Sequence, residues 1–179
     1  DNVAPAVFGG ATVSWMNEET SEVGSVRLTP PEGINPVAFI PDFELRTAAA
    51  RAALPATVPH GDASFNVARG ALLAAVLSGG AQASAGADLH ALLMEATRDR
   101  LHQEQRRAAM EPSLALVDWL RGAGFAAVVS GAGPTVLSLE KVGADIRRDA
   151  AGAGWRVVPL AVAASGVQIT RGSLAKVEF

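Results

Sequence analysis

The segment Val129-Ser130-Gly131-Ala132-Gly133-Pro134-Thr135-Val136 decides the fold, because it joins two apolar, β-prone runs. Residues 125–129 lead into it and residues 136–139 lead out. Gly131 and Gly133 stand one residue apart, and glycine reaches positive φ while adding no side chain. Such a loop lets backbone N–H groups converge on a phosphate or a carboxylate. Glycine clusters also form plain hairpin turns, so the glycines alone leave both interpretations open.

Two familiar phosphate-binding motifs are excluded at this loop. A Walker P-loop needs Gly-Lys followed by Ser or Thr, and no such sequence follows Gly133. A dinucleotide fingerprint opens a helix, whereas the residues after Pro134 have the pattern of a strand. Any anion bound here would therefore be held by a strand–loop–strand arrangement.

The composition is that of a globular domain with a weak negative charge. The 179 residues are 49% hydrophobic and 18% charged, with a net charge of −3, which argues against disorder. No basic field is present to hold nucleic acid or an anionic membrane. No apolar run reaches the roughly 18 residues of a membrane span. We therefore predict no nucleic-acid partner and no membrane partner.

Cysteine and histidine usage gives no metal centre. The sequence has no cysteine, which rules out a disulfide framework and thiolate ligands and fits a cytoplasmic protein. His60, His90 and His102 lie far apart, without the spacing of metal ligands. We predict no metal site within these residues.

The order of the expected elements is that of an α+β fold. Pro30-Pro31-Glu32-Gly33 is the expected domain boundary. Before it we expect a short helix, a Gly9-Gly10 break and strands over 11–15 and 25–28. After it we expect a strand over 37–40, helices beginning at Thr47, at Asp62 or Ser64, at Asp88 and at Pro112, the hairpin, a helix over 142–153, a strand over 155–162 and a further strand over 167–169. This order predicts an antiparallel-rich sheet with helices on one face, a ferredoxin-like pattern.

Two sets of polar residues stand out on the expected helices, and a solvated helix surface is the ordinary interpretation of both. Thr47 and Arg51 are four residues apart and so share one face of their expected helix, with Thr47 as its N-cap. Arg98, Arg100, Arg106 and Arg107 form a cluster after the helix that begins at Asp88.

Four segments, taken together, resemble the homoserine kinases, a family of the GHMP superfamily of small-molecule kinases. They are Asp1-Asn2-Val3-Ala4-Pro5, the stretch from Pro41 through Thr47 and Arg51 to Pro55, Leu101-His102-Gln103-Glu104-Gln105-Arg106, and Ser130-Gly131-Ala132-Gly133-Pro134-Thr135. Gln105 departs from the pattern, since the family has an aromatic residue before its Arg. The segments follow the family's order along the whole chain.

The resemblance implies that this chain is the C-terminal part of a longer enzyme. Members of the family are roughly twice as long, and their N-terminal half carries the Gly-rich loop that wraps ATP and the carboxylate for Mg²⁺. We therefore expect residues 1–28 to be a remnant of the N-terminal, ATP-binding domain and residues 29–179 to be the GHMP C-terminal domain. The main ligands of ATP and Mg²⁺ are expected in the missing half, and the chain alone is expected to be inactive.

The implied reaction transfers the γ-phosphoryl group of ATP to L-homoserine, giving O-phospho-L-homoserine for threonine biosynthesis. The resemblance assigns substrate binding to Asn2, Arg51 and Arg106, and a guanidinium suits the substrate carboxylate. It assigns to Thr47 the task of orienting the substrate or relaying a proton. Ser130, Gly131, Ala132 and Gly133 would support the ATP loop. The implied partners are homoserine, ATP and the missing half, and a homodimer is an assembly that the resemblance allows.

Two other functions stay open at this point. One is another GHMP kinase, of the mevalonate type, because mevalonate also has a carboxylate. The other is a non-catalytic, ferredoxin-like module that binds an amino acid and needs no ATP-binding half.

Overall fold

A computed structural model describes residues 3–80 and 88–169. The chain divides into two compact units, one formed by residues 1–28 with 163–179 and the other by residues 29–162. The expected division into residues 1–28 and 29–179 stays a prediction, and the two compact units differ from it in the assignment of the residues after Val162. The assignment of residues 1–28 to a remnant of an ATP-binding domain stays a prediction.

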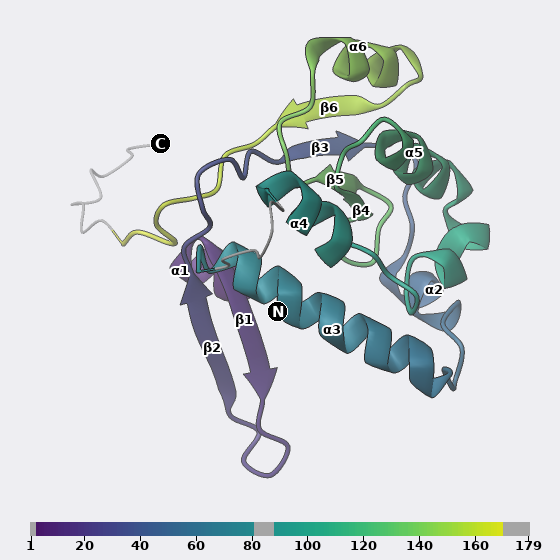
Figure 1. Ribbon diagram of the computed structural model, residues 1–179. Coiled ribbons are helices and arrows are strands. Elements are labelled where there is room, and N and C mark those ends of the chain that lie inside the picture. The colour runs from purple at the N-terminus through teal and green to yellow at the C-terminus, as the bar shows by residue number, and fades with distance from the viewer. Residues whose placement is uncertain (1–2, 81–87, 170–179) are drawn as a thin grey trace, which may run out of the picture. The chain divides into compact units, whose positions relative to one another are not determined.

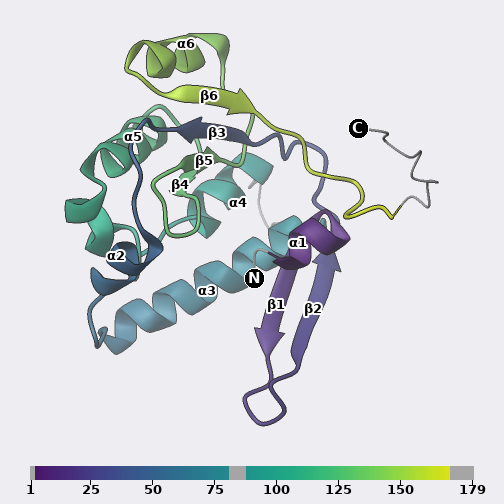
Figure 2. The same cartoon turned by 180° about the vertical axis from the view of Figure 1, so that it is seen from behind.

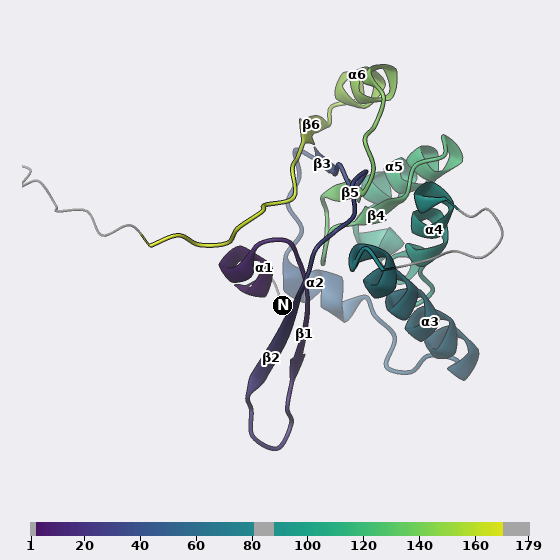
Figure 3. The same ribbon diagram turned by 60° about the vertical axis from the view of Figure 1, so that its left-hand side comes forward.

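The smaller unit is a helix followed by a β-hairpin (Figures 1 and 3). Helix α1 (Val3–Phe8) ends at two glycines with positive φ, Gly9 at 70° and Gly10 at 67°. Strands β1 (Ala11–Met16) and β2 (Val23–Leu28) then pair in antiparallel fashion. The expected helix, glycine break and strands are confirmed. No strand is found at residues 167–169, contrary to expectation, because their only backbone pairing is from Val167 to the Ala6 carbonyl.

The larger unit contains a four-stranded antiparallel sheet, seen from two sides in Figures 1 and 2. Its spatial order is β4 (Ala127–Val129), β5 (Val136–Ser138), β3 (Val37–Ile40) and β6 (Arg156–Pro159). Phe39 in β3 is fully buried and lies opposite Val136 on one side and Val157 on the other. The α+β class with an antiparallel sheet is confirmed.

Six helices lie in the described residues of this unit. They are α2 (Thr47–Ala52), α3 (His60–Leu77), α4 (Leu89–Ala96), the 3₁₀ helix η1 (Glu104–Ala109), α5 (Glu111–Gly122) and α6 (Ala144–Gly152). One core cluster joins the sheet to α5, whose buried face includes Leu114, Val117 and Leu120, and to Ala150 of α6. A second cluster joins α3 and α4 through Val76 and Leu93.

Helix ends show where local signals were sufficient and where they were not. Asp88 caps α4 as expected, since its Oδ1 accepts the Ala91 N–H at 2.8 Å. Thr47 is the first helical residue of α2, not its N-cap, because Arg46 holds the extended conformation that precedes the helix. Helix α3 begins at His60, before Asp62 and Ser64, because the Pro59 carbonyl already accepts from the Asp62 and Ala63 N–H groups.

Candidate active site

The glycine-rich segment is the loop of the β4–β5 hairpin, as expected. The Ser130 N–H donates to the Thr135 carbonyl at 2.8 Å, and the Gly133 N–H donates to the Ser130 carbonyl at 2.9 Å. Gly131 and Gly133 have φ values of 60° and 85°, in the left-handed region that favours glycine. The loop is therefore closed by its own backbone, with Ser130 and Gly131 exposed at its tip.

The two glycines face different surroundings. A Cβ added at Gly133 would lie 2.7 Å from the Sδ atom of the buried Met110, whereas a Cβ at Gly131 would meet nothing within 4 Å. No residue in the described ranges accepts the N–H of Gly131 or Ala132. Two successive N–H donors are thus left without a protein acceptor among the described residues, a feature that anion-binding loops share.

Helix α5 holds the far end of this loop. Ser113 is fully buried in the first turn of α5, and its Oγ donates to the Pro134 carbonyl at 2.6 Å. The hydrogen bond satisfies a hydroxyl that would otherwise be costly to bury. It fixes the loop to a helix that is itself part of the main core.

Helix α2 carries two of the predicted site residues. Thr47 and Arg51 lie one helical turn apart and both side chains are exposed. Among the residues that the structure describes, no carboxylate pairs with Arg51. Its guanidinium is therefore available to a ligand with a carboxylate or phosphate group.

Arg106 in η1 connects α2 to the glycine-rich loop. Its Nε donates to the Ala50 carbonyl at 3.0 Å, and its Nη1 donates to the Gly131 carbonyl at 3.4 Å. Helix α2 ends at Ala52, and the Leu54 N–H bonds to the Arg51 carbonyl, so the Ala50 carbonyl lacks its usual helical partner. Arg106 supplies that partner and is only 9% exposed. The solvated-surface interpretation is therefore wrong for Arg106.

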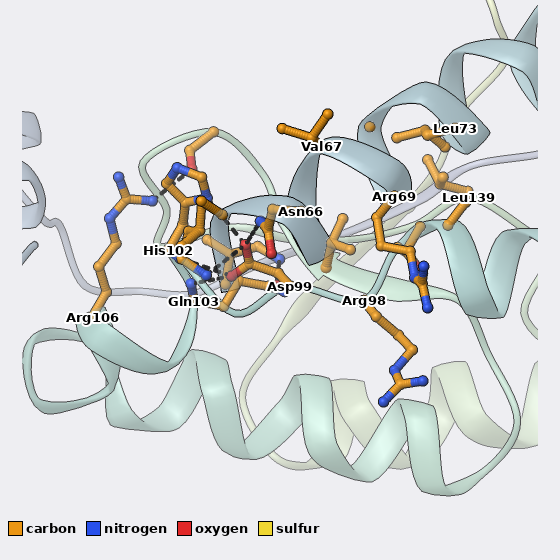
Figure 4. A pocket seen from close by; sticks show the side chains of 18 of the residues that line it. Asn66, Val67, Arg69, Leu73, Arg98, Asp99, His102, Gln103, Arg106 and Leu139 are labelled. Carbon is orange, nitrogen blue, oxygen red and sulfur yellow. Dashed lines mark hydrogen bonds and ion pairs between the residues drawn. The ribbon is translucent and has the colours of Figure 1, made fainter. Parts of the chain in front are cut away.

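Asp99 organises the turn that leads to Arg106 (Figure 4). Its carboxylate accepts from Asn66 Nδ2 at 2.6 Å and from the backbone N–H groups of Leu101 at 3.2 Å, His102 at 2.9 Å and Gln103 at 2.6 Å. Burial raises the pKa of the Asp99 carboxyl, but the hydrogen bonds from Gln103, Asn66 and His102 outweigh it and lower the pKa to about 2. The carboxylate therefore stays ionised at neutral pH.

Two cavities border these elements. One of about 730 Å³ is lined by α3, the 96–106 segment and the start of the loop, and its wall includes Arg106 and Gly131 (Figure 4). A second, of about 410 Å³, is lined by residues 40–45, which lead into α2, together with Pro134 and Thr135. Both volumes fall in the range of small-molecule sites.

The structure thus brings most of the predicted site residues to one region. Arg106 contacts both the helix of Thr47 and Arg51 and the loop that contains Ser130, Gly131, Ala132 and Gly133. Asn2 lies outside the described residues. Asp99, Gln103 and Ser113 were missed, because their partners are 26 residues away for Gln103, 21 for Ser113 and 33 between Asp99 and Asn66.

No group of three or more His, Asp or Glu side chains in the described ranges could hold a metal ion. Within the same part of the chain, no helix is both long enough and apolar enough to cross a membrane.

A family model described as the C-terminal domain of GHMP kinases matches residues 72–153, which include η1, α5 and the β4–β5 hairpin. Over these residues the chain is similar to a GHMP kinase C-terminal domain. The segments that carry the sequence resemblance, Leu101 to Arg106 and Ser130 to Thr135, both lie within the matched residues.

Curated relatives extend the similarity to nearly the whole chain. A homoserine kinase of Streptomyces avermitilis is 44% identical over 170 residues, which are 94% of this chain and 52% of that protein. A homoserine kinase of Streptomyces coelicolor is 42% identical with the same coverage. The chain spans about half the length of the curated relatives it matches, and it matches their C-terminal half.

A solved structure supports the fold. The crystal structure of homoserine kinase from Cytophaga hutchinsonii superposes with a TM-score of 0.73, covering 92% of this chain and 52% of that one. The two sequences are 19% identical over the superposition, so this likeness bears on the architecture alone.

Proposed function

We propose that this chain is the homoserine-binding part of an ATP-dependent homoserine kinase. The observation that carries the proposal is the link made by Arg106 between the Arg51 helix and the Gly131 loop, in a chain whose relatives are homoserine kinases. The intact enzyme is then a longer polypeptide that contains this chain and an ATP-binding half. Because ATP and the intermediates of amino-acid biosynthesis are found in the cytoplasm, we propose that the enzyme is located there.

The proposed site matches the chemistry of homoserine. The substrate carries a carboxylate, an ammonium group and one hydroxyl, and Arg51 offers a guanidinium with no paired carboxylate among the described residues. Arg106 uses two of its five N–H donors on backbone carbonyls, which leaves donors for the substrate carboxylate. We assign the ammonium or hydroxyl group to Asn2 by the resemblance alone.

Phosphoryl transfer requires mainly positioning and charge stabilisation. The homoserine hydroxyl oxygen forms a bond to the γ-phosphorus as the bond to the β–γ bridging oxygen breaks, and the hydroxyl proton is released. We assign to Thr47 the orientation of that hydroxyl or the relay of its proton. The free N–H groups of Gly131 and Ala132 would support the phosphate-binding loop of the other half. By the resemblance, we place the Mg²⁺ ligands in that half as well.

The proposal is tested by Arg106→Ala in the intact enzyme. We expect the homoserine KM to rise about tenfold or more, since a charge-assisted hydrogen bond is worth about 1.5–3 kcal/mol, with little change in the ATP KM. Arg107→Ala is the matched control, because Arg107 pairs with Glu104 and Asp118 at the surface. An unchanged homoserine KM would remove Arg106 from the site. A substrate panel with homoserine and mevalonate separates the two GHMP activities, and homoserine is expected to be preferred.

A further inference from the structure

The residue that leads into the glycine-rich loop is hydrogen-bonded to a side chain that does not belong to the sheet. Strand β4 is the outermost strand, so backbone N–H groups on its free side have no strand to pair with. Val129 is the last residue of β4 and directly precedes the loop. Its N–H donates to the side-chain oxygen Oε1 of Gln103 at 2.7 Å. A side chain therefore takes the place of a neighbouring strand at the point where the loop begins.

Gln103 is itself fixed by the Asp99 turn. Its N–H donates to the Asp99 carboxylate at 2.6 Å, and Asn66 of α3 binds the same carboxylate. The Asn66 Oδ1 also accepts the Arg100 N–H at 2.9 Å. The backbone of Gln103 is thus anchored through Asp99 to the 18-residue helix α3, and the side chain reaches the Val129 N–H from that anchored position.

Gln103 and Arg106 form hydrogen bonds to the two residues that flank Ser130 in the loop. Gln103 accepts the N–H of Val129, and Arg106 donates to the carbonyl of Gly131. Arg106 also binds the Ala50 carbonyl in the helix of Arg51. One short segment, residues 103–106, is therefore hydrogen-bonded both to the loop that carries the free N–H groups of Gly131 and Ala132 and to the helix that carries Thr47 and Arg51.

We propose that Gln103 is a positioning residue for the phosphoryl transfer. It acts through the Val129 N–H, whose position sets where the Gly131 and Ala132 N–H groups point. Gln103 also lines the cavity of about 730 Å³, so the test must separate an effect on kcat from one on the homoserine KM. This inference rests on the proposed function. Removal of the Gln103 acceptor should misplace the loop and lower kcat, whereas the carboxylate-binding donors of Arg51 and Arg106 stay in place.

The test compares Gln103→Met, which keeps the side-chain length and removes the acceptor, with Gln103→Glu, which keeps an acceptor. In the intact enzyme we expect Gln103→Met to lower kcat about 10-fold to 100-fold, as a misplacement of about 1 Å does, with the homoserine KM changed less than threefold. Gln103→Glu should stay within about threefold of the unchanged enzyme. A higher homoserine KM with unchanged kcat would overturn the proposal.

Amide hydrogen exchange in the intact protein gives a second readout that needs no activity. Gln103→Met should speed exchange at the Val129 N–H while exchange in α5 stays slow. Gln105→Met is the matched control, because the Gln105 side chain donates to the Arg100 carbonyl and not to the loop. Unchanged exchange at Val129, or faster exchange throughout the chain, would contradict a positioning role. If the intact enzyme phosphorylates no homoserine, the proposed function is wrong, and the exchange result still decides whether Gln103 holds the loop.

Discussion

Gly131 and Gly133 share a positive φ but differ in what surrounds them. Gly133 approaches Met110 and the Val129 side chain closely, so its missing Cβ is a packing requirement. Gly131 borders open space and needs glycine for its conformation alone. Gly133 is therefore needed for the packing of the loop against Met110. Gly131 is needed for the backbone conformation at the exposed tip, where a ligand could approach.

The pair gives a prediction on stability. We expect Gly131→Ala to lower the free energy of unfolding by about 1 kcal/mol, through the backbone conformation. Gly133→Ala adds an overpacked contact with Met110 and should cost about 2–4 kcal/mol in total. Urea unfolding of the two variants measures the difference, and equal losses of stability would contradict the assigned packing role.

Segments of secondary structure were predictable where the signal was local. Val37 to Ile40 is a short apolar run between Pro36 and Pro41, and it forms β3 within those bounds. Asp88 caps α4 because a cap needs only the next three residues. The Asp99 turn is local in its bonds to the N–H groups of residues 101–103, but the bond from Asn66 in α3 could not be predicted from the turn itself. The same applies to Arg106, whose burial depends on a carbonyl 56 residues away.

The Asp99 turn predicts a pH dependence of stability. The pKa of its carboxyl falls from an ordinary value near 3.8 to about 2 on folding. A carboxyl whose pKa is lower in the folded state than in the unfolded state increases the free energy of unfolding at every pH above its ordinary pKa. This contribution is lost as the pH falls from about 4 to 2. The loss is at most about 2 kcal/mol, since one pKa unit corresponds to 1.36 kcal/mol.

Thermal unfolding of Asp99→Asn checks this expectation. The variant should be less stable than the unchanged chain at pH 7, and the difference should shrink between pH 4 and pH 2. Asp145→Asn is the control, because Asp145 pairs with Arg148 at the surface of α6, where ion pairs contribute about 0–1 kcal/mol. A difference for Asp99→Asn that is the same at pH 7 and pH 2 would rule out the carboxylate as its source.

The larger unit, considered by itself, contains the residues that we propose for one half of an active site. It supplies cations for a carboxylate and free N–H groups at a loop, and its described residues include no metal-binding cluster. The resemblance placed Arg51, Arg106 and the Gly131 loop in one site, and Arg106 contacts both the helix of Arg51 and that loop. Their roles stay predictions. The sequence did not predict how they are held, because Gln103, Ser113 and Arg106 act on backbone groups that only the fold brings near.

The most direct test of the homoserine kinase assignment is transfer of γ-labelled phosphate from ATP to L-homoserine. We expect the intact enzyme to form labelled O-phospho-L-homoserine and the isolated 179-residue chain to form none. Absence of transfer by the intact enzyme would contradict the proposed function. Transfer by the isolated chain would contradict the division of the active site between two halves of a longer polypeptide.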